Sequence, residues 1–412
     1  MGLINSVITG IGIIAPGAIG KEDFWKMQEE GKNAISEITS FPVSRFSVRT
    51  GAEVKNFDAK SLLGHKGLRN LDKSTLFLLA ASKQALESAN LEITDKNTDD
   101  IGICTGTTFS HLWPIVEFDR EVFNEGLSLA NPALFPSTVV NAASSHVSIR
   151  FNIQGFNTTI STGYTSGLEA LRYAIRALES RKSRIALSGA VDTLTESLFS
   201  GFRKLGYLAG ITGEALSCPF DKRRNGPLFG EGAVVFSVED LRGAEERNAN
   251  IFAKIRSISS SFDGFRVNKI HPRGEGLEKA IRQALERAAV SLGEVDYISS
   301  CANSSQELDR IEVKVLKNIF GRQLEKIPVS SIKSMIGETF STGGNFQIAS
   351  CIGAMLRGIV PPTINYRQID EECRINCVPN KAEKKDVRIA LVVCFGPGGY
   401  NSACILERYL KQ

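Results

Sequence analysis

The sequence predicts an α/β fold with buried sheets, and two observations support this prediction. Short apolar runs rich in β-branched residues recur along the 412 residues, and segments with helical periodicity separate one run from the next. Such alternation is typical of layered α/β proteins, and the apolar character of the runs indicates strands that are covered on both faces. The predicted strands are residues 6–14, 100–106, 158–161, 184–188, 232–238, 253–260, 295–299, 328–330 and 387–395.

Residues 167–180 form the clearest predicted helix. Apolar residues recur there at intervals of three or four, whereas Glu169, Arg172 and Arg176 lie on another face. This spacing gathers the apolar side chains in one stripe, which we expect to face the core. The stripe consists of Leu168, Leu171, Ile175 and Leu178.

The chain is predicted to consist of two halves, residues 1–250 and 251–412. A polar stretch rich in Arg and Glu, residues 239–250, is interpreted as a connector, and the alternation of strand and helix begins again after it. A chain of 412 residues, of which 42% are hydrophobic, is long enough to bury a large core and favours two structural units over one.

Charge and hydropathy exclude two classes of partner. The formal net charge of +4 comes from 49 basic and 45 acidic residues that are spread along the chain without a basic stripe, so a nucleic-acid partner is not expected. Apolar runs of membrane-spanning length are missing, so a membrane protein is not expected either. Met1, Gly2 and Ser6 match the minimal myristoylation pattern, but a buried strand is predicted from Ser6 onward, and we expect no lipidation.

Cysteine usage indicates a reducing compartment. The eight cysteines lie mostly within apolar runs and contain no CxxC pair, which favours reduced thiols in a cytoplasmic protein over a disulfide framework or a zinc site. We therefore expect no bound metal.

The turn that precedes the predicted helix carries the first chemical motif. Residues 160–168 read Ile-Ser-Thr-Gly-Tyr-Thr-Ser-Gly-Leu and resemble the nucleophile segment of β-ketoacyl synthases, in which a Cys stands at the position of Tyr164. A thiol at a helix N-terminus is activated by the helix dipole and by unpaired N–H groups. A tyrosine, with its ordinary pKa of about 10, offers no equivalent nucleophile. We interpret Tyr164 as a residue that fills the site.

Two further segments resemble the same family and also lack its imidazoles. In residues 301–312, Asn303 stands where the family has a His, and it can donate a hydrogen bond but cannot carry a proton. In residues 331–338, Lys333 matches the family's Lys, whereas Glu338 replaces the second His and its carboxylate would repel a developing enolate. The four histidines of the chain lie outside these segments.

The resemblance extends over nearly the whole chain and points to one branch of the family. Residues 219–226, 230–233 and 395–403 resemble the loops that follow the nucleophile region and the glycine-rich turn near the C-terminus. Residues 189–192, 307–310 and 398–403 look like those of the chain length factor, the β subunit of type II polyketide synthases. In that branch a Gln usually stands at the position of Tyr164. The resemblance implies a thiolase-like fold with duplicated α-β-α-β-α layers.

The resemblance also implies a function. It describes a non-catalytic subunit that pairs with an active ketosynthase α subunit as a heterodimer and helps to set the length of a poly-β-ketone chain. No bound cofactor is implied, because the growing chain is carried on the phosphopantetheine arm of a partner acyl carrier protein. Phe395 is implied as the gate of the acyl pocket. The residues implied to line the tunnel are Phe109, Leu112, Trp113, Val116, Leu134, Leu198 and Phe199.

Two alternatives stay open at this level. The apolar residues assigned to the tunnel are also suited to fill an ordinary core. The chain could also be an enzyme with altered chemistry, in which Glu338, Lys333 or a hydroxyl of Thr165 or Ser166 supports acyl transfer or hydrolysis. Against the enzyme, Lys333 and Glu338 are more simply interpreted as an ion pair that keeps an emptied site neutral.

Overall fold

The computed structural model describes residues 5–411, and its centre is one eleven-stranded sheet in which the same strand order occurs twice. The first half runs β6-β5-β7-β8-β1 and the second half runs β11-β10-β14-β15-β9. The strands of the first half are β1 (Ser6–Ala15), β5 (Ile101–Gly106), β6 (Asn157–Ile160), β7 (Ile185–Asp192) and β8 (Gly232–Asp240). Those of the second half are β9 (Ala253–Phe262), β10 (Tyr297–Ser299), β11 (Val329–Ser330), β14 (Ile389–Phe395) and β15 (Tyr400–Glu407).

Strand directions repeat as well. In each half the second strand along the chain pairs in parallel with the third and the fourth, and the fifth pairs antiparallel with the fourth and the first. This identity of order and direction is the duplication of a thiolase-like fold, as predicted. Strand β1 also pairs with β9, so one continuous sheet joins the halves. The division at residue 250 therefore stays a prediction.

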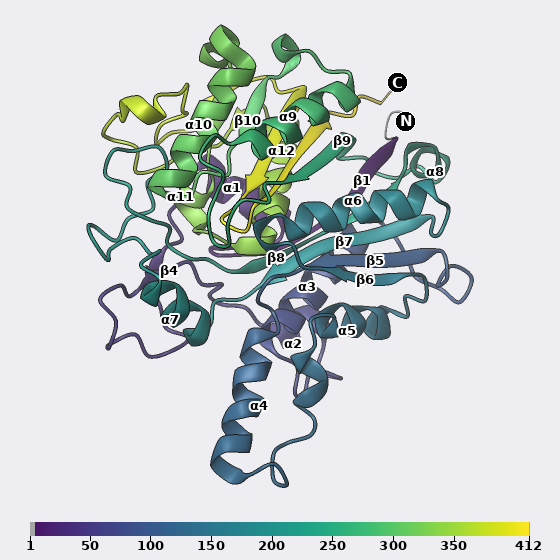
Figure 1. Cartoon of the computed structure of the whole chain (residues 1–412). Coiled ribbons are helices and arrows are strands. Elements are labelled where there is room, and N and C mark those ends of the chain that lie inside the picture. The colour runs from purple at the N-terminus through teal and green to yellow at the C-terminus, as the bar shows by residue number, and fades with distance from the viewer. Residues whose placement is uncertain (1–4, 412) are drawn as a thin grey trace.

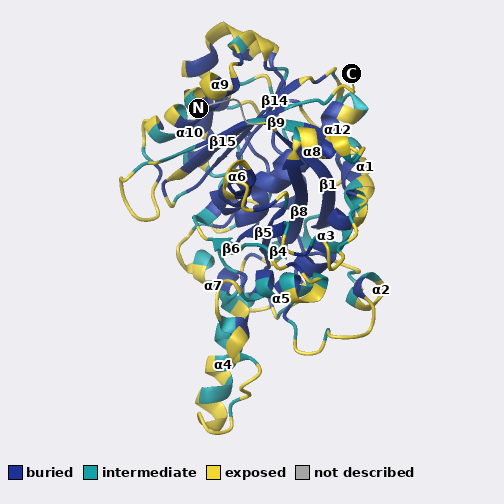
Figure 2. Ribbon diagram, turned by 90° about the vertical axis from the view of Figure 1, so that its right-hand side faces the viewer, coloured by how far each residue is buried: buried dark blue, intermediate teal, exposed yellow. Residues whose placement is uncertain are grey.

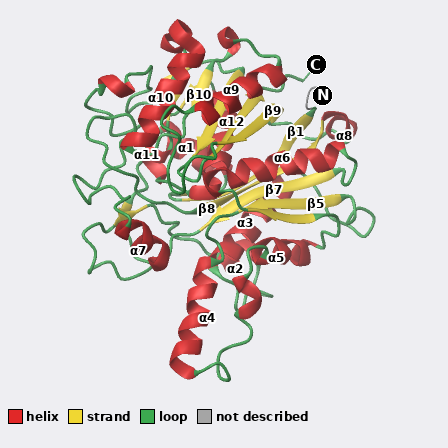
Figure 3. Ribbon diagram, in the orientation of Figure 1, coloured by secondary structure: helices red, strands yellow, loops and turns green. Residues whose placement is uncertain are grey.

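Helices cover the sheet in three layers (Figures 1 and 3). Helices α3 and α5 pack on one face of the first half, α9 and α10 lie on the outer side of the second half, and α6 and α12 contact each other between the halves. This arrangement gives the expected α-β-α-β-α layers. The helices of these layers are α3 (Lys73–Ser88), α5 (Ala142–Phe151), α6 (Ser166–Glu179), α9 (Glu275–Ala288), α10 (Gln306–Phe320) and α12 (Gly343–Arg357).

The central helix α6 confirms the helix predicted over residues 167–180. All four residues of its predicted stripe are buried, and Figure 2 shows the helix among the buried strands of the sheet. Gly106 at the end of β5 permits this packing, because a Cβ there would come within 2.4 Å of the Ser166 backbone. The smaller elements are α1 (Lys21–Glu29), α2 (Ala59–Leu63), α7 (Glu196–Lys204), α11 (Lys333–Ile336), β2 (Ala18–Ile19), β3 (Ser36–Glu37), β4 (Thr50–Gly51), β12 (Ile359–Val360) and β13 (Glu383–Lys384).

Several elements of the structure were not predicted from the sequence, and two of them show the reason. Strand β15 was not predicted, because Asn401 and Ser402 interrupt its apolar run, yet both side chains are buried and hydrogen-bonded to Asp263 and Glu169. The connector over residues 239–250 contains a short helix, α8 (Leu241–Glu246), whose N-cap is Asp240. Met1 and Gly2 of the myristoylation pattern lie outside the described residues.

An arm projects from the body of the molecule (Figures 1 and 2). It consists of helix α4 (Leu112–Glu125) and the loop over residues 126–140. Several large apolar side chains on the arm are exposed, among them Phe123, Leu127 and Leu129. Between residues 5 and 411, none of the helices combines the length and the apolarity needed to cross a bilayer.

Candidate functional site

The structure brings Tyr164, Asn303, Lys333 and Glu338 together in one buried cluster. The Lys333 ammonium donates to Glu338 Oε2 at 2.8 Å, and the Asn303 amide donates to the same oxygen at 2.7 Å. The Lys333 Nζ lies 5.7 Å from the centre of the Tyr164 ring. The three segments singled out in the sequence therefore meet at one place, as their resemblance to a single active site implies.

Tyr164 lies in a short 3-10 turn, Gly163–Thr165, which leads into the N-terminus of α6. Its ring is 7% exposed and packs edge-on against Phe340, with the ring centres 5.8 Å apart. The ring also lies against Gly396, where a Cβ would come within 2.7 Å of it. The Tyr164 ring is therefore packed between Phe340 and Gly396 in front of the helix terminus.

The electrostatics of Tyr164 oppose ionisation. Burial raises the pKa of its phenol well above the usual value, and the negative charge of Glu338 raises it further. The Tyr164 hydroxyl donates to the hydroxyl of Tyr207 at 3.4 Å, which is a long hydrogen bond. Burial likewise raises the pKa of Tyr207, to about 12. Both residues are neutral phenols at physiological pH and offer no nucleophile.

Glu338 makes more contacts than a simple ion pair. Besides the two donors on Oε2, its Oε1 accepts the backbone N–H of Phe340 at 3.0 Å. Lys333 is fully buried at the start of α11, and burial lowers its pKa, but the charges of Cys301 and Glu338 outweigh burial and raise it. The site is therefore a closed set of hydrogen bonds around a buried cation and a buried carboxylate.

Cys301 is a functional candidate that the sequence reasoning did not single out among the eight cysteines. Lys333 Nζ lies 3.3 Å from its sulfur, and the Phe395 backbone N–H donates to the same sulfur at 3.4 Å. Burial opposes ionisation of this thiol, but a hydrogen bond from Cys394 and the charge of Lys333 outweigh burial and lower its pKa to about 7. Its position two residues before Asn303 was the signal that could have drawn attention to it.

An aromatic cluster continues from Tyr164 toward the base of the arm. Phe340 packs edge-on against Phe109 at 5.2 Å, and Phe109 packs edge-on against Phe202 at 5.9 Å. Phe229 contacts both Phe340 and Phe202, with ring centres at 4.8 and 5.0 Å. Phe109 thus belongs to the site, whereas the sequence reasoning missed Phe202, Phe229, Phe340 and Tyr207.

The other residues assigned to the tunnel and its gate are distributed over five places. Leu112 is half-buried against the core beneath the arm, whereas Trp113 and Val116 line an outer cavity of about 390 Å³ together with Phe41 and Leu194. Trp113 is 42% exposed there.

Further along the chain, Leu134 is half-buried in the loop of the arm. Leu198 and Phe199 lie in α7, and Phe199 packs on Phe41 and Phe46 rather than on Phe109. Phe395 is fully buried beside Cys301. Only Phe109 and Phe395 of the eight residues are placed by these contacts beside the cluster that surrounds Tyr164.

The hydroxyls of Thr165 and Ser166 are already bonded to the backbone. Thr165 Oγ1 donates to the carbonyl of Thr162 at 3.1 Å, and Ser166 Oγ donates to the carbonyl of Gly163 at 2.6 Å. These contacts occupy the hydroxyl protons with backbone carbonyls, and neither carbonyl is a general base.

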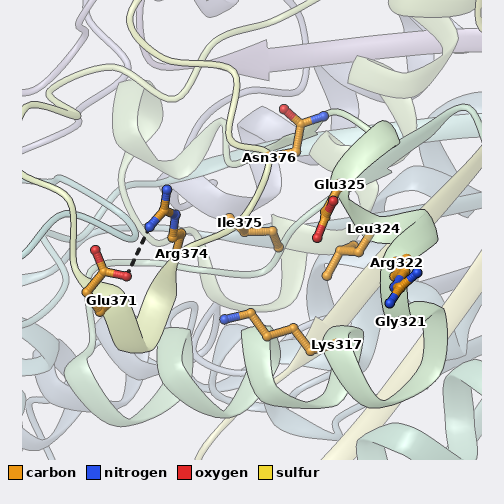
Figure 4. A pocket seen from close by; sticks show the side chains of 9 residues that line it. All are labelled: Lys317, Gly321, Arg322, Leu324, Glu325, Glu371, Arg374, Ile375 and Asn376. Atoms are coloured by element: carbon orange, nitrogen blue, oxygen red, sulfur yellow. Dashed lines mark hydrogen bonds and ion pairs between the residues drawn. The ribbon is translucent and has the colours of Figure 1, made fainter.

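A separate cavity, lined by none of the residues of this cluster, is seen from close by in Figure 4. Its volume is about 860 Å³, and it is a surface groove between the end of α10 and residues 371–376. Lys317, Arg322 and Arg374 line it together with two carboxylates, one of which pairs with Arg374 at 3.3 Å. None of its lining residues is a Ser, Thr, Cys or His, and we assign it no chemistry. Within residues 5–411 no group of three or more metal-ligating side chains occurs.

The duplicated layers, together with a site at the N-terminus of the central helix, define this molecule as a thiolase-like protein. Residues 6–244 match the N-terminal domain of β-ketoacyl synthases and residues 252–367 match the C-terminal domain. The chain belongs to the β-ketoacyl synthase family.

Two curated relatives match almost end to end. The 3-oxoacyl-(acyl-carrier-protein) synthase 2 of Coxiella burnetii is 31% identical over 406 residues, which cover 98% of each chain. The tetracenomycin polyketide synthase ketoacyl synthase alpha subunit of Streptomyces glaucescens is 31% identical, over 98% of this chain and 96% of its own.

Solved structures agree with this assignment. The ishigamide ketosynthase/chain length factor superposes with a TM-score of 0.91 at 26% identity, over 99% of this chain and 100% of its own. A complex of a type II polyketide synthase acyl-carrier protein with its ketosynthase bound to the hexaketide gives a TM-score of 0.90 at 25% identity, over 98% and 99%.

Proposed function

We propose that this chain is a chain length factor, the non-catalytic subunit that pairs with an active ketosynthase in a type II polyketide synthase. One observation carries the proposal. Where the family resemblance requires a Cys and two His, the chain has Tyr164, Asn303 and Glu338, and their polar groups are bonded to one another, to Lys333 and to Tyr207. A neutral phenol, an amide and a carboxylate cannot perform thiolate attack and imidazole proton transfer.

The exposed apolar side chains of the arm support the heterodimer. Phe123 is 90% exposed and Leu127 is 75% exposed, which is unusual for side chains of this size unless another protein covers them. The partner proposed here is a ketosynthase that retains its Cys and both His. The growing chain would be delivered on the phosphopantetheine arm of an acyl carrier protein that serves the pair.

The proposal is tested by intact-protein mass spectrometry. The isolated chain, incubated with acyl-loaded and malonyl-loaded carrier proteins, is expected to gain no acyl mass and to release no carbon dioxide from the malonyl group. Tyr164→Cys is expected to stay inactive, because Asn303 and Glu338 are unchanged. A stable acyl adduct within residues 160–168 of the natural chain would contradict the proposal.

One observation favours a second candidate, an acyltransferase of altered chemistry. The Cys301 thiol, with its lowered pKa and with Lys333 at 3.3 Å, is the strongest nucleophile of the cluster. The same mass measurement separates the two candidates. Peptide mapping that finds an acyl group on Cys301, absent from Cys301→Ser, would establish the second candidate and exclude the first.

A further inference from the structure

The substituted site residues are connected to the base of the arm by an unbroken series of contacts. The Tyr164 ring packs on Phe340, and Phe340 packs on Phe109, each pair edge-on with ring centres less than 6 Å apart. Phe109 directly precedes the arm, since α4 begins at Leu112 and the Leu112 N–H donates to the Phe109 carbonyl at 3.0 Å. Phe340 is therefore the one ring between Tyr164 and Phe109, the residue that precedes the arm.

Phe340 is held in this position by its backbone. Its φ is +52°, a conformation that a bulky residue rarely adopts and that surrounding contacts must maintain. The Phe340 N–H is bound by Glu338 Oε1 at 3.0 Å. Glu338 itself is fixed by Lys333 and Asn303, so the residues at the family's two His positions together anchor the turn that aims the Phe340 ring.

A second, independent connection joins the same two segments. The buried carboxylate of Asp192 accepts the N–H of Phe109 at 2.6 Å through Oδ1 and the N–H of Ser341, next to Phe340, at 3.0 Å through Oδ2. One side chain thus ties the backbone of Phe109 to the backbone of the Phe340 turn. The relative position of the two rings is set by hydrogen bonds as well as by packing.

We infer that Tyr164 and Glu338 are positioning residues, which hold Phe109 in place through Phe340 and thereby help to set the length of the product. This inference rests on the proposed function, in which Phe109 is part of the wall that the growing chain meets. Close-packed rings do not yield to an advancing chain, but a ring whose support is removed can turn aside. The residues at the family's catalytic positions would then act by positioning the wall that limits product length.

The ring of Tyr164, rather than its hydroxyl, carries this role. The hydroxyl makes only the long 3.4 Å bond to Tyr207, whereas the ring makes the contact with Phe340. Tyr164→Phe keeps the ring contact and Tyr164→Ala removes it, so these two variants form a matched pair. Phe340→Leu removes the central ring, and Phe77→Leu is its control, because Phe77 is equally buried in the separate cluster with Phe57.

The first measurement uses the isolated chain and needs no partner. Hydrogen exchange of the peptide over residues 107–113 is compared among the variants. We expect faster exchange in Phe340→Leu and Tyr164→Ala, and unchanged exchange in Tyr164→Phe and Phe77→Leu. Equal exchange in all four variants would overturn the inference whatever the function of the chain.

The second measurement uses the complex with the ketosynthase, carrier protein and malonyl donor, and reads product masses. Phe340→Leu and Tyr164→Ala are expected to shift products toward longer chains, and Phe340→Leu should add nothing further in a Phe109→Ala background. The inference would be overturned if a folded, partner-bound Phe340→Leu variant made products of unchanged length. It would also be overturned if Phe340→Leu lengthened the products equally in the natural and in the Phe109→Ala background.

A different result tests the proposed function. If the natural chain forms no complex and alters no product, the proposed function fails, and the inferred effect on product length fails with it. The hydrogen-exchange result still decides whether Tyr164 and Phe340 position Phe109.

Discussion

The polar side chains of Tyr164, Asn303, Lys333 and Glu338 are hydrogen-bonded inside the protein. Among them, the Lys333 ammonium depends most on its partners. The side chains of Lys333 and Glu338 are almost completely buried, and a buried ammonium without a counter-charge is costly. The same carboxylate also binds Asn303 and the Phe340 backbone. A change at Glu338 is therefore expected to affect stability far more than a change in a surface ion pair.

Glu338→Ala is expected to lower the free energy of unfolding by about 3–5 kcal/mol, because it removes the carboxylate that binds the buried Lys333 ammonium. The control is Glu87→Ala, which breaks an exposed pair with Lys83 and is expected to cost less than about 1 kcal/mol. Urea unfolding of the isolated chain measures both. Similar losses in the two variants would show that the buried pair does not carry the stability assigned to it.

Cys301 gives the site a pH dependence. Its pKa of about 7 in the folded chain lies below the value of about 8.5 of a free thiol. The unfolded chain therefore binds more protons between these values, and the free energy of unfolding is expected to rise with pH from about 7 to about 8.5. This contribution is lost as the pH falls through the folded pKa.

Two measurements check this under reducing conditions. Thiolate absorbance of the folded protein should show a titration near pH 7 that Cys301→Ser lacks. The rise of the unfolding free energy between pH 7 and 8.5 should also be smaller in Cys301→Ser. If the substitution leaves both curves unchanged, Cys301 is an ordinary buried thiol.

How far the site could be predicted depends on the kind of signal each residue carries. Tyr164, Asn303, Lys333 and Glu338 lie in segments whose resemblance to one active site places them together, and the structure does bring them together. Tyr207 lies in a loop without periodicity, so no sequence pattern predicts its contact with Tyr164. The separation of Trp113 from Phe109 depends on how α4 turns, which the spacing of the apolar residues alone does not settle.

At the scale of elements, predictable strands are those whose residues are apolar on both faces. The apolar runs yield β1, β5, β7, β8 and β14, in which nearly every residue is buried. The missed strand β15 has an equally buried run, but polar side chains with buried partners interrupt it. Pattern reasoning fails where a tertiary hydrogen bond makes burial of a polar residue favourable.

The arm is the element that exposes Phe123, Leu127 and Leu129, three large apolar side chains, to solvent. Phe123→Ser combined with Leu127→Ser removes two of its most exposed apolar side chains. Because neither is buried, we expect the free energy of unfolding to stay within about 0.5 kcal/mol of the natural value for each change. Binding to the ketosynthase should weaken markedly.

Light scattering of the co-expressed pair measures this effect, and Val267→Ser serves as control because Val267 is 89% exposed on a different loop. A natural chain that stays a stable monomer beside a ketosynthase, or a double variant that binds as well as the natural chain, would show that the arm is not the contact surface.

At the scale of the whole molecule, the duplication explains where the site lies. Tyr164 comes from the first half of the chain, whereas Asn303, Lys333 and Glu338 come from the second, so the cluster forms only when the halves pack. Helices α6 and α12 meet between the halves, and Phe340 and Phe109 are brought together at the same junction. The wall proposed for the product is therefore fixed by the same packing that stabilises the fold.

Phe109 and Trp113 offer two different surfaces at the base of the arm for the product to meet. Phe109 is held inside the aromatic cluster, whereas Trp113 is 42% exposed in the outer cavity. If both residues line the tunnel, Trp113→Ala and Phe109→Ala are both expected to lengthen the product. We expect the larger increase in product length from Phe109→Ala, because the Phe109 ring, unlike that of Trp113, is held by neighbouring rings and cannot turn aside. Product masses from the reconstituted pair decide this. A larger shift from Trp113→Ala would place the path of the chain through the outer cavity, and unchanged lengths in both partner-bound variants would remove both residues from the tunnel.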